Sequence, residues 1–138
     1  MSREFKIGAD PELFVFDNVA SQFISAHNIF PGTKYEPHPI GVVGAIQVDG
    51  TAFEFNIAPA VTSGEFIRNI NSVLSFARVH LRKFDNNLEF KTEPTAIYPQ
   101  DYFDALPQVS KELGCEPDYN AWTGKVNPKP STKKPMRT

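Results

Sequence analysis

Hydrophobic and polar residues alternate most regularly over residues 44–57, GAIQVDGTAFEFNI. Asp49-Gly50 in its middle is typical of a two-residue β-hairpin turn, and a turn at these residues pairs Val48 with Thr51. Side chains of a strand point alternately to its two faces. One face of the hairpin then carries Ile46, Val48, Phe53 and Phe55, and the other carries Ala45, Gln47, Ala52, Glu54 and Asn56. The second face is polar, and its small alanines leave room beside the glutamate.

Residues 63–84 repeat apolar side chains at the spacing of an amphipathic helix. The apolar positions are Phe66, Ile67, Ile70, Val73, Leu74, Ala77 and Leu81. Thr62 and Glu65 form a capping-box pattern, in which each side chain accepts a hydrogen bond from an amide of the first turn. The pattern therefore predicts a helix that packs one face on a sheet, with a solvated basic face opposite.

Shorter patterns complete an α+β fold, an antiparallel sheet with one long amphipathic helix packed on it. Strands are expected at residues 5–8, 12–17, 22–26 and 88–91, and a short helix at 100–106. Residues 27–39 form a long loop, and such loops tend to be functional or mobile. We assign residues 1–124 to this domain. Residues 125–138, with three prolines, four lysines and one arginine, are expected to form a basic tail or linker.

Composition narrows the class of protein. The 138 residues suffice for one domain, and an apolar share of 41% with 12 phenylalanines argues against disorder. A net charge of −2 gives no general attraction to nucleic acid, which is not an expected partner. The single cysteine, Cys115, excludes an intramolecular disulfide, and no apolar run approaches the roughly 20 residues of a membrane span. These features indicate a soluble, cytoplasmic protein without a membrane partner.

Three acids stand out from this background: Asp10, Glu12 and Glu54. Asp10 and Glu12 flank a proline at the start of the apolar run LFVF, and Glu54 lies between two phenylalanines. A carboxylate among apolar neighbours is costly unless it is hydrated, paired or metal-bound. The residues alone leave two interpretations, the solvent face of a half-exposed sheet or a magnesium site. Asp49 is expected to serve the hairpin turn.

Several blocks, taken in order, resemble a known family. They are IGADPELFVF, PGTK, GAIQVDGTAFEFNIAPA, a helix, and LGCEPDYNAW, which together run from Ile7 to Trp122. This series resembles the phage-type carboxylate–amine ligases (type two) of the glutamate–cysteine ligase and glutamine synthetase superfamily. The resemblance implies about half of a glutamine synthetase-like catalytic domain, and a phage protein in the cytoplasm of an infected host cell.

The resemblance also implies a chemistry. In such enzymes ATP phosphorylates a carboxylate, and an amine attacks the acyl phosphate to give an amide. Acids on a curved antiparallel sheet hold Mg²⁺ ions that bridge the nucleotide phosphates. By position, Asp10 and Glu12 look like the first metal-binding block and Glu54 like the second acid. Substrate contacts are expected from Asn56, Gln47 and Lys34, where the substrate is a small molecule or a peptide.

The sequence departs from the family at its end. Related ligases continue beyond an "RT"-like stretch into a Gly-Gly-His strand, whereas this sequence stops at Arg137-Thr138. We therefore expect the N-terminal part of a ligase whose sheet is completed by a second polypeptide or by a homo-oligomer. The alternative is a truncated, non-catalytic phage protein that acts as a binding or inhibitory module through an exposed sheet edge.

Overall fold

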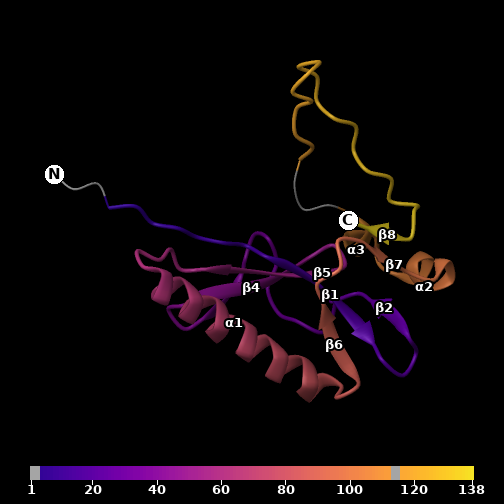
Figure 1. Cartoon of the computed structure of the whole chain (residues 1–138). Helices are drawn as coiled ribbons and strands as arrows, with labels where there is room; N and C mark the ends of the chain where they lie inside the picture. The colour runs from indigo at the N-terminus through magenta and orange to yellow at the C-terminus, as the bar shows by residue number, and fades with distance from the viewer. Residues whose placement is uncertain (1–3, 113–115) are drawn as a thin grey trace.

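The computed structural model describes residues 4–112 and 116–138 and shows an antiparallel sheet with a helix of 22 residues, as expected (Figure 1). Cys115 lies outside the described residues. The elements are, in order, β1 (Glu12–Asp17), β2 (Gln22–Ile24), β3 (His38–Ile40), β4 (Gly44–Asp49), β5 (Ala52–Ile57), α1 (Ser63–Phe84), β6 (Leu88–Lys91), β7 (Ala96–Ile97), α2 (Gln100–Ala105), α3 (Gln108–Lys111) and β8 (Met136–Arg137).

The main sheet has the order β2-β1-β5-β4-β3, and β6 also pairs with β1. All of these pairs are antiparallel. The first residues of β1 pair with β5, whereas its later residues pair with both β2 and β6. A single strand therefore joins the two parts of the sheet, and its acidic first residue, Glu12, lies where β1 meets β5.

The hairpin of β4 and β5 has a different register from the one the sequence predicts. Val48 pairs with Phe53 instead of Thr51, so the turn consists of Gly50 and Thr51. Gly50 has a φ of +59°, and glycine is favoured at this first turn position in the type II′ hairpin. Because the register moves by two residues, every side chain keeps its predicted face. Asp49 becomes the last residue of β4.

Tertiary contacts explain this choice of turn. The Thr51 side chain is buried, and its Oγ1 accepts a hydrogen bond from the Tyr98 hydroxyl at 2.9 Å. Burial raises the pKa of Tyr98 to about 12, so its phenol remains a donor. Gly50 also packs tightly, since a Cβ there would lie 2.8 Å from the Glu112 carbonyl oxygen. The turn thus depends on segments that follow it by many residues.

The sheet carries a hydrophobic core on each face. Leu13 and Val15 of β1 belong to the larger core, together with buried residues of β4, β5 and α1. Phe14, which points the other way, belongs to a smaller core with Ala96, Tyr98 and other residues of the β7–α2 region. The apolar run LFVF therefore serves two cores. Glu12 shares the face of Phe14 by its period of two, so it lies on the side of the smaller core.

Helix α1 has the predicted bounds and cap. The Glu65 amide donates to the Thr62 Oγ1 at 3.1 Å, and the Glu65 carboxylate accepts from the Val61 amide at 2.8 Å. The reciprocal cap is confirmed, although the Glu65 carboxylate accepts from the amide of Val61, the residue before Thr62, instead of from an amide of the first turn. Helix α1 lies against β4, β5 and β6 (Figure 1). The buried positions of the helix recur at four-residue intervals and are Asn69, Val73, Ala77 and Leu81.

Three sequence expectations differ from the structure. Residues 5–8 form no strand, because only Ile7 makes a single bridge, to Ala60. The expected loop at residues 27–39 includes the start of β3, at His38. Before β3 the chain is anchored by buried Phe30 and by His80, whose Nε2 lies 2.7 Å from the Ile29 carbonyl oxygen. The expected tail ends as β8, which pairs with β7. Among the described residues, no helix has the length and apolarity needed to cross a membrane.

Candidate metal centre

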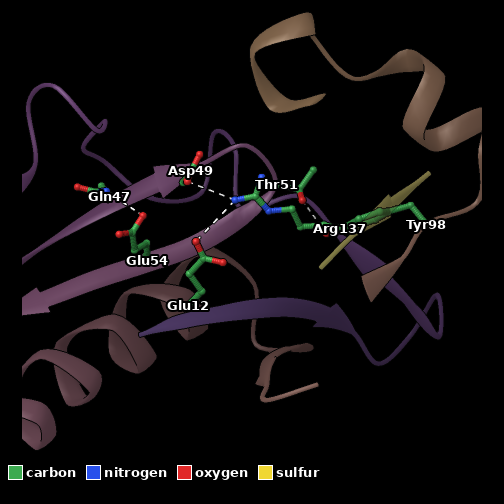
Figure 2. A network of polar contacts seen from close by, with 7 residues as sticks. All are labelled: Glu12, Gln47, Asp49, Thr51, Glu54, Tyr98 and Arg137. Carbon is green, nitrogen blue, oxygen red and sulfur yellow. Dashed lines mark hydrogen bonds and ion pairs between the residues drawn. The ribbon is translucent and has the colours of Figure 1, made fainter. Parts of the chain in front are cut away.

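Neighbouring strands place three polar side chains in one row across the sheet. Glu12 of β1 lies opposite Glu54 of β5, and Gln47 of β4 lies opposite Glu54 from the other side. The Gln47 Nε2 donates a hydrogen bond to the Glu54 Oε2 at 2.9 Å (Figure 2). Two like charges directly opposite each other destabilise a sheet. A nearby positive charge, or protonation of one of the two acids, would relieve this repulsion.

Asp49 adds a third carboxylate to this row. It lies two residues after Gln47 on β4 and so projects from the same face. Glu12, Asp49 and Glu54 each offer an oxygen, and these three oxygens lie within 4.8 Å of one another. The sequence analysis assigned Asp49 to the hairpin turn and did not select it as a candidate ligand. Asp49 lies two residues from Gln47, which the hairpin pattern places on the same face as Glu54, and this spacing could have identified it.

Arg137 of β8 supplies the positive charge. Its Nη2 lies 3.2 Å from the Asp49 Oδ2 and 3.6 Å from the Glu12 Oε1 (Figure 2). The arginine side chain is only 9% exposed, and pairing of Arg137 with Ala96 fixes its place at the end of β8. Nothing local in the sequence distinguishes this arginine from the other cations of the C-terminal segment. We call Glu12, Asp49 and Glu54 with Arg137 the acidic cluster.

The environment of Glu54 disfavours its charged form. Burial raises the pKa of Glu54, and the charges of Asp49, Glu12 and Asp10 raise the pKa further, in that order. The hydrogen bond from Gln47 acts in the opposite direction. Arg137 pairs with the other two acids, whereas Glu54 accepts its hydrogen bond from the neutral amide of Gln47. Additional positive charge at the cluster would therefore stabilise the Glu54 carboxylate.

Replacing Glu54 with Gln is expected to stabilise the protein at neutral pH. Because the folded-state pKa of Glu54 lies above its usual value of 4.5, its ionisation disfavours the folded state. The gain should be below about 1 kcal/mol, since solvent partly screens these charges. It should shrink as the pH falls through the raised pKa toward 4.5, where wild-type Glu54 becomes protonated in the folded protein. Urea unfolding across this pH range measures the gain in stability, with Glu93→Gln at an exposed position as the control. An equal gain at every pH would contradict the prediction.

Three other predicted site residues do not join this group. Asp10 is exposed and outside the group of three oxygens, although its charge acts on Glu54. Asn56 follows on the same face of β5, opposite Ala45. Lys34 lies in the exposed part of the loop between β2 and β3. The structure thus joins Glu12, Glu54 and Gln47 directly, whereas Asp10, Asn56 and Lys34 are not part of this group.

Comparisons with protein-family models, with curated proteins and with solved structures found no match to this chain. The chemistry of the cluster is therefore argued from its own residues. Three carboxylates offer the oxygen ligands that Mg²⁺ prefers. Arg137 balances two of them, so the cluster is arranged around a positive charge.

Proposed function

We propose that this chain supplies metal-binding carboxylates of an ATP- and Mg²⁺-dependent carboxylate–amine ligase. The observation that carries the proposal is the convergence of Glu12, Asp49 and Glu54, with oxygens within 4.8 Å of one another. Two of these acids, Glu12 and Glu54, are those that the resemblance to the phage-type ligases selects. Their pairing across β1 and β5 brings together two motifs that are far apart in the sequence.

The donor set fits a small divalent cation. Magnesium takes oxygen ligands at about 2.1 Å and commonly uses one or two carboxylates together with substrate phosphates. Small side-chain rotations would bring the three oxygens to one ion. Such an ion would also relieve the mutual repulsion that helps to raise the pKa of Glu54. Arg137 competes for Asp49 and Glu12, so metal binding requires the guanidinium to give up or share these contacts.

The residues of this chain have separate tasks in the proposed reaction. Glu12, Asp49 and Glu54 would hold the metal, and Gln47 orients Glu54 through its amide hydrogen bond. Arg137 keeps the acids together before the metal binds, since it neutralises part of their charge. A bound Mg²⁺–nucleotide would supply charge stabilisation for phosphoryl transfer to a carboxylate.

Calorimetry with Mg²⁺ alone and with Mg²⁺-ATP tests the proposal. Glu12→Gln and Glu54→Gln each remove one anionic ligand and keep the side-chain shape, so each should weaken Mg²⁺ binding about tenfold or more, which corresponds to about 1.4 kcal/mol. Glu93→Gln, an exposed glutamate outside the cluster, is the matched control and should bind as the wild type does. Absence of Mg²⁺ binding, or equal binding by all four proteins, would refute the proposal.

The ion pairs of Arg137 favour one alternative, a non-catalytic binding protein in which the cluster is purely structural. In that case the arginine permanently occupies the position of the cation. The same titration separates the two functions, because a structural cluster predicts no Mg²⁺ binding by the wild type. Glu12→Gln would then change stability alone.

A further inference from the structure

A cavity of about 300 Å³ lies beside the acidic cluster, between the β4–β5 turn, α3 and the C-terminal segment. The residues that matter for its chemistry are Thr51, Ser110, Lys111, Ser131, Lys134 and Arg137. Arg137 belongs to both places, since it lines this cavity and also pairs with Asp49 and Glu12. We call this cavity the α3 pocket.

Two polar atoms of the α3 pocket residues are buried without a hydrogen-bond partner among the described residues. They are the Ser110 Oγ and the Arg137 Nε, in residues that are 3% and 8% exposed. A buried polar group that lacks a partner costs about 1–3 kcal/mol, and native proteins rarely keep one without a reason. Arginine Nε only donates, and a serine hydroxyl can donate as well. Both atoms can therefore donate a hydrogen bond, and the described residues provide no acceptor for either.

The charge of the α3 pocket indicates which kind of acceptor fits. Lys111, Lys134 and Arg137 line it, and the described lining residues include no aspartate or glutamate, although Thr138, the last residue of the sequence, also lines the pocket and carries the terminal carboxylate. Lys111 is fixed in place, because its Nζ donates to the Asp104 carbonyl oxygen at 2.8 Å and lies over the Phe103 ring. Lys134 is exposed. Hydrogen bonds between charged donors and an anion are stronger than those between neutral groups.

We propose that the α3 pocket binds a small oxyanion, a phosphate or carboxylate group, that accepts hydrogen bonds from the Arg137 Nε and the Ser110 Oγ. Lys134 attracts the anion to the pocket. The Nη2 of the same guanidinium remains on the acidic cluster. The pocket is argued from its own residues; its assignment to a nucleotide phosphate or a substrate carboxylate of a ligase rests on the proposed function.

Titrations of the whole chain with inorganic phosphate and with acetate, both in buffer freed of divalent cations by a chelating resin, test this proposal. Ser110→Ala removes one buried donor, which for a bond to a charged group is worth about 1.5–3 kcal/mol, so binding should weaken about tenfold or more. Lys134→Gln should weaken binding severalfold, and more strongly at low salt. Tighter binding of phosphate than acetate identifies a phosphoryl site, and the reverse order identifies a carboxylate site.

Matched controls keep the result specific. Ser75→Ala on the exposed side of α1 and Lys133→Gln beside Lys134 lie outside the pocket and should bind as the wild type does. Ser110→Ala removes a hydroxyl that has no hydrogen-bond partner among the described residues, and thermal unfolding checks that the variant still folds. Lys134 is exposed, so Lys134→Gln tests anion binding independently of any effect on folding. Binding of neither anion, or equal binding by both pocket variants and the wild type, would overturn the proposal. Because the resin-treated buffer holds no divalent cations, this outcome is independent of whether the acidic cluster binds Mg²⁺.

Discussion

Replacing Arg137 with Gln is expected to lower the free energy of unfolding by about 3 kcal/mol in the absence of divalent cations. The substitution leaves Asp49, whose side chain is 10% exposed, without the cation 3.2 Å from its carboxylate. Removing one partner of a buried ion pair is costly because the other charge remains buried. Glu12 is more exposed and contributes less to the loss. Urea unfolding at neutral pH measures the difference.

A second substitution and a metal titration test the reason for this loss. Asp49→Asn in the Arg137→Gln background removes the buried negative charge that has lost its arginine and should recover part of the stability. Mg²⁺ should stabilise Arg137→Gln more than the wild type, since the ion no longer competes with the guanidinium. Arg78→Gln, at an exposed position of α1, is the matched control and should change the free energy of unfolding by less than about 0.5 kcal/mol. Equal stability of the two arginine variants would show that the ion pairs do not hold the cluster.

Replacing Phe53 with Ala is expected to cost about 3–5 kcal/mol. Phe53 is fully buried, and its ring centroid lies 4.5 Å from that of Phe30 and 4.9 Å from that of Phe90. The truncation leaves a cavity where the loop after β2, strand β5 and strand β6 meet. Phe53 also precedes Glu54 on β5, so loosening of this strand should weaken Mg²⁺ binding at the acidic cluster as well.

Thermal and urea unfolding measure the effect of Phe53→Ala, and Phe76→Ala is the matched control. Phe76 lies on α1 with 40% of its surface exposed, so its truncation should cost below about 1.5 kcal/mol. Similar losses for the two variants would contradict the position of Phe53 at the centre of the larger core.

The sequence predicted those features that depend on local pattern. The helix bounds followed from apolar spacing and the capping box at Thr62, because both are properties of one continuous segment. The hairpin faces followed from the period of two, which a register shift of two residues does not change. Glu12 and Glu54 were recognised as unusual because each carboxylate interrupts or precedes an apolar run.

Only the tertiary structure decided which residues meet. The turn moved to Gly50 and Thr51 where Tyr98, Arg137 and the segment after α2 pack against it, and this placed Asp49 in the acidic cluster. Arg137 and Ser110 lie in segments whose local patterns give no sign of a site. Their proximity to β4 and β5 results from long-range packing, which composition and periodicity do not encode. The sequence by itself therefore determined on which face of the sheet the acids lie. The fold determined that Arg137 balances their charge and that the α3 pocket lies beside the acidic cluster.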